Sequence, residues 1–386
     1  MPKNQLKTKH LTVCFFGTYD RTYTSNVMFK KALELNDIDV LEVNAHIQVT
    51  RLDKQADMSW KHLLRRLIAK YRIVPTTLKH WAEIKKSDVI YVGYPGHFDV
   101  FFAWIVAKLA NKKLIFNPLL IIYTGFSEEQ GILKKTSLMG WGMKLAESLV
   151  YRLCDRVFAD TPLQESYFKK VFGLSAEKLR VLAIGADDQY YAYTPYTNKT
   201  EKIEVTYYGL YSPIHGVEHI IEAANILKND KDIKFTMVGN KGNTYQENYD
   251  RAQKLGLKNI TFYDDLPLSE HPAIIKKADL FFGFLTHTPT VDRVIPNKIY
   301  QGLALGKIVI TSDAAVTCSV FSHNENIILV KPNDPQALAN EILALKKNPT
   351  KRKHIADTGY KLFIENYAPK AVGAELKRYI EELLAA

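Results

Sequence analysis

The stretch IEVTYYGLYSPIHGVEHIIEAANILKN at residues 203–229 predicts a β-strand, a turn bounded by glycines and an amphipathic helix. Residues 203–209 are apolar and rich in β-branched and aromatic side chains, which favours a buried strand. Residues 217–229 place apolar side chains at helical spacing. Strand and helix patterns also alternate in the first half of the chain. The alternation begins again at residue 203, which predicts a second domain.

The same alternation of strands and helices runs through both halves of the chain. In the first half, the strand pattern LTVCFFG at residues 11–17 is followed by an amphipathic helix pattern at residues 27–36. Such alternation implies a parallel sheet with helices on both faces. The expected strands are 11–17, 38–44, 88–94, 113–119, 156–161 and 180–185, followed by 203–209, 235–240, 259–265, 278–285, 307–312 and 326–332.

The division between the halves falls in QYYAYTPYTNKTEK at residues 189–202, which is polar and turn-rich. We therefore predict an α/β chain of two Rossmann-like, doubly wound domains, residues 1–188 and 189–386. The carboxyl ends of their strands would face a shared cleft, where sheets of this kind bind ligands. The C-terminal helix pattern at 371–386 can pack back on the first domain.

Composition predicts a soluble protein of the cytoplasm. Hydrophobic residues make up 47% and charged residues 24% of the chain, and no apolar run is long enough to span a membrane. The first ten residues lack the apolar core of a signal peptide. The three cysteines, Cys14, Cys154 and Cys318, fit no zinc-binding spacing, and we expect buried free thiols.

Positive charge is concentrated in the first half. Residues 1–185 hold 28 Lys and Arg against 17 Asp and Glu, whereas residues 186–386 hold 24 of each. Residues 59–74 combine leucines at helical spacing with basic residues, which suits a helix lying on an anionic membrane surface. It equally suits an ordinary surface helix with its leucines in the core. No nucleic-acid recognition motif accompanies the basic excess, so nucleic acid is not an expected partner.

Three glycine turns follow expected strands. Gly209 and Gly216 bound the turn quoted above, Gly239 lies near the end of the strand pattern at 235–240, and Gly17 precedes Thr18 and Tyr19. Glycine lets the backbone approach a ligand closely and exposes N–H groups to an anion. A strand-to-helix turn needs glycine in any case, so each turn alone indicates little.

The stretch RVIPNKIYQGLALGKIVI at residues 293–310 predicts a short helix with a lysine in its first turn. Asn297 is a good N-cap residue, and Gly306 suits the position just after the helix. Lys298 is unfavourable there because the helix dipole repels a cation, unless an anion such as phosphate binds beside it. Gln301 would share the same side of the helix. A solvated lysine on an ordinary helix is the alternative.

Together these pieces resemble the donor-binding domain of family-4 retaining glycosyltransferases (glycosyltransferase group 1), which have the GT-B fold. The first half resembles the family more loosely, through FFGTYDRTYTSN, ADTPLQESYFKKVFG and KLRVLAIGAD. In the second half the matching pieces, in order, are GLYSPIHGVEHIIEAA, FTMVGN, NITFYDDLP, ADLFFGF, IPNKIYQGLALGKIVI and ENIILVKPNDPQALANEI.

The resemblance implies a retaining transferase that moves a hexose from a UDP- or GDP-linked sugar to an acceptor hydroxyl, without a metal or other cofactor. The acceptor is expected to belong to cell-surface glycan or glycolipid assembly. It would be a lipid-linked molecule if residues 59–74 bind the inner face of the membrane, and otherwise a glycan. Gly17, Thr18 and Tyr19 would lie on the acceptor side. The donor would contact Gly209, His215, Gly216, Gly239, Asn297, Lys298, Gln301 and Glu325, with residues 262–267 beside the base and Lys298 on the diphosphate.

The chain departs from the family pattern at three positions. The family commonly has two glutamates eight positions apart, where this chain has Arg293 and Gln301. Gln301 can still hydrogen-bond a ribose hydroxyl, but without charge. After the strand KLIF the family often has His or Asp, where Asn117 stands here. Asn117 cannot transfer a proton, whereas His97 could line the acceptor side or serve as a capping or core histidine.

Two other classes compete with an active transferase. A binding module that kept the fold but lost activity is favoured by Arg293, Gln301 and Asn117, and donor hydrolysis separates it from an enzyme. A pyridoxal-phosphate phosphorylase on a similar fold would need a buried Schiff-base lysine, and an absorbance scan tests for the cofactor.

Overall fold

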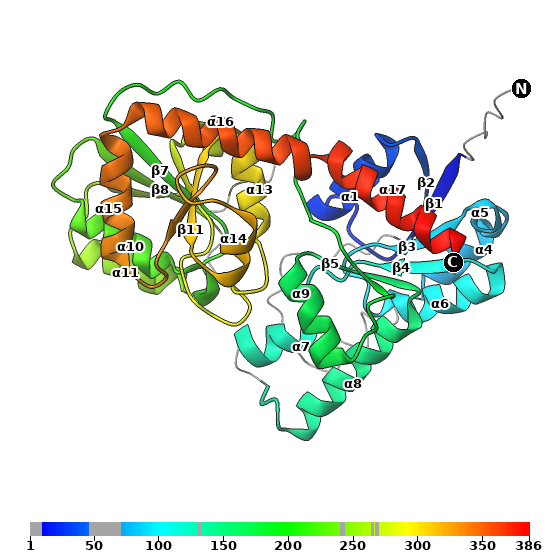
Figure 1. Ribbon diagram of the computed structural model, residues 1–386. Helices are drawn as coiled ribbons and strands as arrows, with labels where there is room; N and C mark the ends of the chain where they lie inside the picture. Colours follow the sequence, from blue (N-terminus) through cyan, green and yellow to red (C-terminus); the bar gives the residue numbers. More distant parts are fainter. Residues whose placement is uncertain (1–9, 46–70, 130–132, 240–243, 264–265, 267–269) are drawn as a thin grey trace, which may run out of the picture.

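The computed structural model describes residues 10–45, 71–129, 133–239, 244–263, 266 and 270–386, and shows two six-stranded parallel sheets side by side (Figure 1). The strand order is β2-β1-β3-β4-β5-β6 in the first sheet and β12-β11-β10-β7-β8-β9 in the second. The first sheet consists of β1 (Leu11–Gly17), β2 (Ile38–Asn44), β3 (Val89–Val92), β4 (Lys113–Phe116), β5 (Arg156–Ala159) and β6 (Leu179–Val181). The second consists of β7 (Ile203–Tyr208), β8 (Ile233–Val238), β9 (Ile260–Tyr263), β10 (Leu280–Phe282), β11 (Ile308–Ser312) and β12 (Ile328–Val330).

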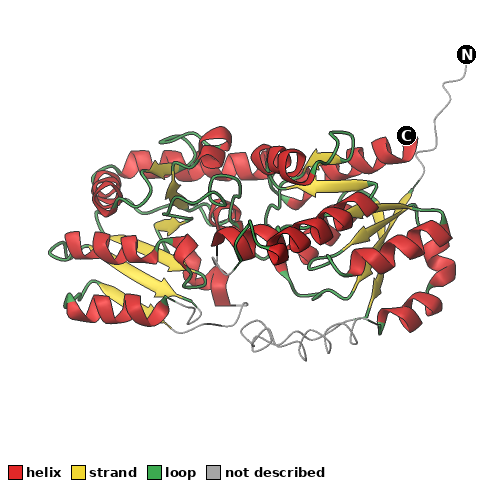
Figure 2. Ribbon diagram, turned by 90° about the horizontal axis from the view of Figure 1, so that it is seen from below, coloured by secondary structure: helices red, strands yellow, loops and turns green. Residues whose placement is uncertain are grey.

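Helices cover both faces of each sheet, as Figure 2 shows from below. This arrangement confirms the predicted doubly wound α/β architecture. In the first half they are α1 (Thr24–Glu34), α4 (Ile73–Lys79), α5 (Trp81–Lys86), α6 (Asp99–Ala110), α7 (Ile122–Thr124), the π-helical η1 (Gly125–Glu129), α8 (Leu138–Leu153), α9 (Pro162–Tyr167) and the π-helical η2 (Phe168–Phe172). In the second half they are η3 (Pro213–His215), α10 (Val217–Ile226), α11 (Tyr245–Lys254), α12 (His271–Lys277), α13 (Asn297–Ala304), α14 (Ala315–Val320), α15 (Pro335–Lys346), α16 (Pro349–Asn366) and α17 (Pro369–Ala385).

Each of the twelve expected strands is present. The strand patterns at 11–17 and 38–44 match β1 and β2 residue for residue, and their seven pairs are in parallel register from Leu11 opposite Ile38 to Gly17 opposite Asn44. Most other strands are shorter than their apolar runs. After β4, for example, the chain turns at Leu119, whose φ is 56°, so the last apolar residues of the run 113–119 lie in a turn.

The last two helices connect the halves. Helix α16 runs along the second half and α17 lies against α1 of the first half (Figure 1). At the crossing a Cβ on Gly373 would lie 2.0 Å from the carbonyl oxygen of Ala32, so only glycine permits this approach. Asn36 donates to the carbonyl oxygen of Lys370 at 3.0 Å, and Lys377 donates to that of Asn36 at 2.9 Å. The C-terminal helix therefore packs on the first half, although it follows the second half along the chain.

Two sequence expectations need correction or lie outside the described residues. Cys14 and Cys154 are buried free thiols as expected, but Cys318 is exposed, because it lies on the solvent side of α14. Most of the expected surface helix at 59–74 lies outside the described residues; of its last residues, Tyr71 is exposed and Ile73 is buried. In the part of the chain that is described, no helix is both long and apolar enough to cross a bilayer.

Candidate active site

Helix α13 begins at Asn297, directly after Pro296. Pro296 has φ −68° and ψ 143°, an extended conformation that proline favours, and it occupies the N-cap position. The expectation that Asn297 caps the helix is therefore wrong: Asn297 is already helical, and no side chain caps this end. The helix ends as expected, with Gly306 at φ 69°. The first N–H groups of α13 lack intrahelical acceptors and suit an anion.

Lys298 is a buried basic residue in the first turn of α13. Its side chain is 7% exposed, and among the described residues Nζ has no hydrogen-bond partner. Nζ lies 4.6 Å from the centroid of the Tyr207 ring, which offers a cation–π contact. Burial lowers the pKa of Lys298 to about 7. A buried ammonium group without a partner is costly, so the site is suited to an anionic ligand.

Lys298 lies against two glycine turns at the carboxyl ends of neighbouring strands. A Cβ on Gly209, whose φ is 147°, would lie 2.9 Å from Nζ of Lys298. A Cβ on Gly239 would lie 1.8 Å from the carbonyl oxygen of Gly209. Side chains at either position would clash with the backbone or the lysine. The two glycines after β7 and β8 thus hold the backbone close to the ammonium group.

His215 follows the same turn and is a neutral residue. Its Nδ1 lies 2.6 Å from the Tyr207 hydroxyl, which donates to the carbonyl oxygen of Leu210 at 2.7 Å. Burial, with a further contribution from nearby Lys298, holds the pKa of His215 well below its usual value. Because the Tyr207 proton is used for Leu210, the neutral imidazole is assigned its proton on Nδ1. Gly216 then enters α10 with φ 69°.

A pocket of about 360 Å³ lies between the halves, beside α13. Asn297 and Gln301 line it from the second half, and the loop after β1 lines it from the first. Gln301 is buried, and within the described chain its Oε1 accepts no hydrogen bond. Lys298 instead packs toward Gly209. Asn297, Lys298 and Gln301 were expected on one side of the helix, but only Asn297 and Gln301 line this pocket. The pocket is completed by Arg21, Thr22, Thr24, Ser25, Val27, Ile184, Gly185, Ala186, Asp187, Tyr190 and Tyr191.

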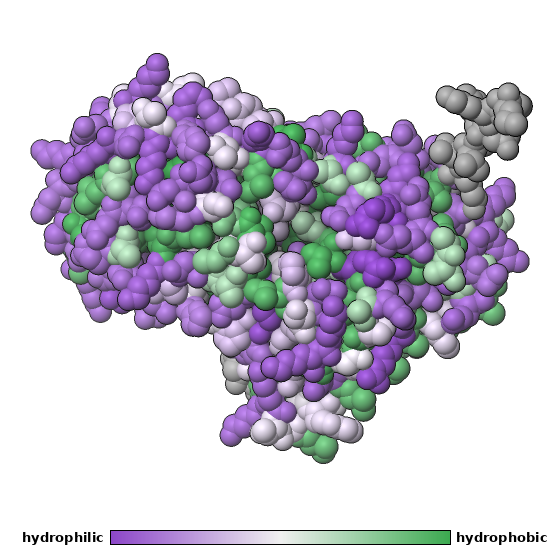
Figure 3. Space-filling view, in the orientation of Figure 1, coloured by the Kyte–Doolittle hydropathy of each residue, from purple (hydrophilic) through white to green (hydrophobic). Residues whose placement is uncertain are grey.

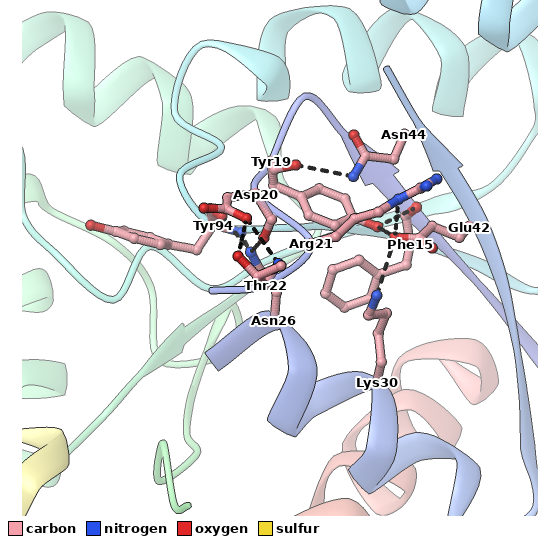
Figure 4. Close-up of polar contacts among 10 residues, drawn as sticks. All are labelled: Phe15, Tyr19, Asp20, Arg21, Thr22, Asn26, Lys30, Glu42, Asn44 and Tyr94. Atoms are coloured by element: carbon pink, nitrogen blue, oxygen red, sulfur yellow. Dashed lines mark hydrogen bonds and ion pairs between the residues drawn. The ribbon is translucent and has the colours of Figure 1, made fainter. Parts of the chain in front are cut away.

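The loop after β1 is held rigid by its own polar contacts (Figure 4). Asp20 accepts hydrogen bonds from the backbone and hydroxyl of Thr22 at 2.8 and 2.7 Å. Asn26 donates to the carbonyl oxygens of Asp20 and Tyr94 at 3.0 and 2.6 Å. Glu42 accepts from Arg21 at 3.2 Å. These contacts fix the pocket wall on the first half.

Two residues expected on the acceptor side face the interior of the first half. The backbone and hydroxyl of Thr18 donate to Asp99 at 2.9 and 3.0 Å. Tyr19 is fully buried, and its hydroxyl donates to Glu42 at 2.8 Å. Gly17 has φ 144°, a conformation that favours glycine, and it is not among the residues that line the pocket. The pocket is therefore lined by Arg21, Thr22 and Ser25, a few residues further along the loop.

Arg293 connects the second half to the first. Its Nη2 lies 2.5 Å from Oε2 of Glu128 in η1, and its guanidinium lies 4.1 Å from the ring centroid of Tyr167. The Thr161 hydroxyl donates to the carbonyl oxygen of Arg293 at 2.6 Å. The arginine that departs from the family pattern is thus an inter-domain contact. Glu128 could not be predicted from the sequence, because it follows no strand and belongs to no motif.

Two buried polar residues follow neighbouring strands of the first sheet. Asn117 accepts from the backbone of Leu119 at 3.2 Å, and its Nδ2 has no partner among the described residues. Asp160 is fully buried, and within the described chain neither carboxylate oxygen accepts a hydrogen bond of normal geometry. Burial raises its pKa to about 8, against a smaller lowering by Gln164. Asp160 was not among the predicted site residues, although it directly follows the apolar strand RVFA.

Asp160 lies near the boundary between the halves. Burial raises the pKa of Tyr300 on α13 well above its usual value, and the charge of Asp160 adds to that effect. Asp160 acts in the same direction on Tyr23 and Tyr94 of the first half, where burial is again the larger cause. The charge of Asp160 therefore acts on tyrosines of both halves, including one on the helix that carries Lys298.

Two other expected site residues are placed elsewhere. His97 lines a groove between α6 and α8, with its ring 5.1 Å from that of Phe116 and Nε2 3.4 Å from Glu147. It is not among the residues that line the pocket beside α13. Glu325 is exposed and pairs with His354 of α16 at 2.9 Å. Neither is held against Lys298 by a contact among the described residues.

Residues 194–362 match the family model described as Glycosyl transferases group 1. The second half of the chain therefore carries a domain of this family. An uncharacterized glycosyltransferase of Methanocaldococcus jannaschii is 27% identical over 189 residues, which is 47% of this chain and 46% of that protein. The chain thus aligns with less than half of that relative's length.

Solved structures share the fold along nearly the whole chain. Anabaena HepE, solved with UDP and glucose, is 15% identical with a TM-score of 0.66, covering 97% of this chain and 100% of that one. Sucrose-phosphate synthase of Thermosynechococcus elongatus is 14% identical with a TM-score of 0.67, covering 98% and 100%. The two-sheet arrangement is accordingly the GT-B fold.

Proposed function

We propose that this protein is a retaining glycosyltransferase that moves a hexose from a nucleotide-diphosphate sugar to an acceptor hydroxyl. One observation carries the proposal: Lys298 is buried without a partner among the described residues, at the N-terminal end of α13 and against Gly209. The domain of Glycosyl transferases group 1 at 194–362 contains this whole arrangement. The acceptor proposed is a glycan or lipid-linked molecule of cell-surface glycan or glycolipid assembly.

The donor diphosphate would lie between Lys298 and the glycine turns. The ammonium group and the free N–H groups of α13 supply positive charge where the leaving phosphate develops negative charge. Neutral His215 supplies none, so Lys298 carries the electrostatic role at this turn. These groups replace a metal in the proposal. Gln301 offers an unoccupied acceptor in the adjoining pocket, suited to a ribose hydroxyl.

The first half would position the sugar and the acceptor. Asn117 follows β4 and offers an amide N–H donor, but no acid or base. In retaining transfer the leaving phosphate itself can accept the proton of the attacking hydroxyl, so no protein base is required. Gly17 and Arg21 border the acceptor side of the cleft. HepE has been solved with UDP-glucose, so UDP donors should be tested first, followed by GDP donors.

A binding module without activity is the second candidate. Arg293 favours it, because this residue is engaged with Glu128 and Tyr167 and cannot accept a hydrogen bond from a sugar hydroxyl. An active transferase and an inactive binding module would share the donor site, and only the transferase would turn over the donor.

Donor hydrolysis by the purified chain tests the proposal. A panel of UDP- and GDP-sugars is incubated with excess chelator, and released nucleotide is measured. We expect turnover of one donor, loss of turnover in Lys298→Met, and retention in Lys307→Met. Lys307 is a matched control, a buried lysine just beyond α13 that donates to the carbonyl oxygen of Lys276 at 2.6 Å. Tight donor binding without turnover would identify the binding module instead.

A further inference from the structure

Helices α6 and α8 expose two parallel stripes of large apolar side chains. The helices pack side by side on the outside of the first half (Figure 1). Their apolar side chains recur every three or four residues on the solvent side, which is one helical face. Leu109 is 68% exposed and Trp141 is 62% exposed. The stripes consist of Phe101, Ile105 and Leu109 on α6 and of Leu138, Trp141, Leu145 and Leu149 on α8.

These stripes are additional to the faces that the two helices bury. Helix α6 already buries Val100, Ala103 and Val106 against the first sheet, so it is apolar on both sides. A helix that is apolar all round is expected inside a core or against lipid, not in water. Contiguous exposed apolar surface of this kind marks an interaction site. Figure 3 shows apolar, green atoms among the polar ones at the lower end of the molecule, where Figure 1 draws α8.

The exposed charges around the stripes are basic. Lys108 is exposed near the end of α6, Lys134 is exposed before α8, and Lys144 is partly exposed within α8. Lys135 is also exposed before α8, but it pairs with Glu128 at 2.6 Å. The two acids of these helices, Asp99 and Glu147, are buried and hydrogen-bonded inside the domain.

Their partners are internal. Asp99 accepts from Thr18, and Glu147 accepts from the backbone of Ile122 and Tyr123 at 2.8 Å. The exposed charges on both helices are therefore positive, which complements an anionic surface.

A groove of about 480 Å³ runs between the two helices beneath the stripes. Its walls are apolar, and His97 and Glu147 lie buried among its lining. A hydrocarbon chain fits such a lining better than a polar ligand does. The groove reaches Ile122, where α7 begins, and the same short segment continues into Glu128, the partner of Arg293. One residue of the groove lining thus belongs to the segment that also carries Glu128. Its apolar lining includes Phe98, Phe101, Ile122, Met139, Met143 and Val150.

We propose that the face formed by α6 and α8 docks on an anionic lipid bilayer and that the groove holds part of a lipid chain. The side chains of Trp141 and Leu145 enter the acyl region while the lysines contact anionic headgroups. A second copy of this chain is a poorer occupant, because a two-fold contact would bring these lysines close to one another. This inference rests on the proposed function in one respect: the docked face would bring the enzyme to a lipid-linked acceptor in the bilayer.

Vesicle sedimentation with the full chain tests the docking face. The probes are phosphatidylcholine vesicles with and without phosphatidylglycerol. We expect binding only to the anionic vesicles, weakened by salt, and at least a tenfold loss of binding in the double variant Trp141→Glu, Leu145→Glu. Both side chains are exposed, so the fold should tolerate the change. Ile364→Glu on α16 is the matched control, an exposed apolar residue outside this face that should leave binding unchanged.

Fluorescence gives a second readout of the same contact. Brominated lipid should quench tryptophan emission in the wild-type chain, and Trp141→Phe should remove most of that quenching. Unchanged vesicle binding in the double glutamate variant would overturn the proposal. Charge reversal at Arg65, Arg66 and Lys70 would then test whether residues 59–74 bind the vesicles instead. Self-association that the double variant abolishes, without vesicle binding, would overturn it in favour of a second copy.

Hydrolysis of a soluble nucleotide sugar is measured in parallel for each variant. The docking variants should leave it unchanged, because the donor site does not involve α6 or α8. Loss of vesicle binding with normal hydrolysis therefore tests the docking face alone. Absence of hydrolysis in the wild-type chain would instead count against the proposed function.

Discussion

Arg293 and Glu128 form an ion pair across the two halves of the chain, with Nη2 and Oε2 2.5 Å apart. Both side chains are largely withdrawn from water, and the guanidinium also lies over Tyr167. Glu128 belongs to η1 of the first half, and Arg293 precedes the helix that carries Lys298. The pair therefore relates the position of α13 to the first domain, where the acceptor is expected to bind.

Removing Arg293 should weaken the connection between the halves. Arg293→Gln is expected to cost on the order of 1–3 kcal/mol of stability, because Glu128 loses a charged hydrogen-bond partner. A double-mutant cycle with Glu128→Gln, measured by urea unfolding, gives the coupling energy. The control cycle uses Lys135, which pairs with Glu128 at 2.6 Å but is half exposed and should couple more weakly. Equal coupling in the two cycles would contradict the inter-domain assignment.

Lys298→Ala should weaken binding of the donor nucleotide diphosphate by on the order of 1.5–3 kcal/mol, the range for hydrogen bonds to charged groups. Calorimetric titration with UDP and GDP measures the change, and Lys307→Ala serves as the control. Unchanged affinity in Lys298→Ala would show that the diphosphate binds elsewhere.

Donor affinity should depend on pH through Lys298. In the protein without donor, burial lowers the pKa of Lys298 to about 7. A bound diphosphate favours the charged form of Lys298 and therefore raises this pKa. Affinity should therefore be greatest below about pH 7 and fall by up to about tenfold per pH unit above it, until the pKa of the complex is reached. A UDP-sugar is the suitable titrant, because its diphosphate ester keeps its charge through this range. In Lys298→Met, donor affinity should be low at every pH and should not fall as the pH rises above about 7.

Asp160→Asn should stabilise the protein at alkaline pH. Burial raises the pKa of Asp160 to about 8, so the folded state holds the proton more tightly than the unfolded chain does. The stability that this proton contributes is fully present below about pH 4 and is lost as the pH rises through about 8. The variant stays neutral, so its advantage should grow with pH by up to about 1.4 kcal/mol per unit in that window. Urea unfolding across the window measures it, with exposed Asp250→Asn as the control.

Asn117→Asp tests whether a proton-transfer group is missing after β4. We expect the variant to fold and to show no large gain in activity, because Asn117 is assigned to positioning the sugar. Donor hydrolysis and acceptor transfer are measured across the pH range. A large new activity that follows the titration of a carboxyl group would show that the natural chain lacks a needed base.

The sequence by itself determined the architecture of this protein. Strands buried on both faces read as continuous apolar runs, and a parallel sheet needs helical crossovers between them, so the runs from Leu11 to Val330 specified two doubly wound sheets. The glycines at 209 and 239 and the helix that carries Lys298 were equally visible, since turn geometry and helix ends depend on neighbours along the chain.

Only the tertiary structure decided which side chains face the cleft. Tyr19 and Arg21 stand two residues apart, yet Tyr19 is buried against Glu42 and Arg21 lines the pocket. His97 follows a strand at the expected edge, but α8 covers it with Glu147. Glu128 meets Arg293, and Thr161 donates to the Arg293 carbonyl oxygen, only because the halves pack together. Such pairs lie more than a hundred residues apart, and local periodicity carries no information about which distant side chain a folded chain brings into contact.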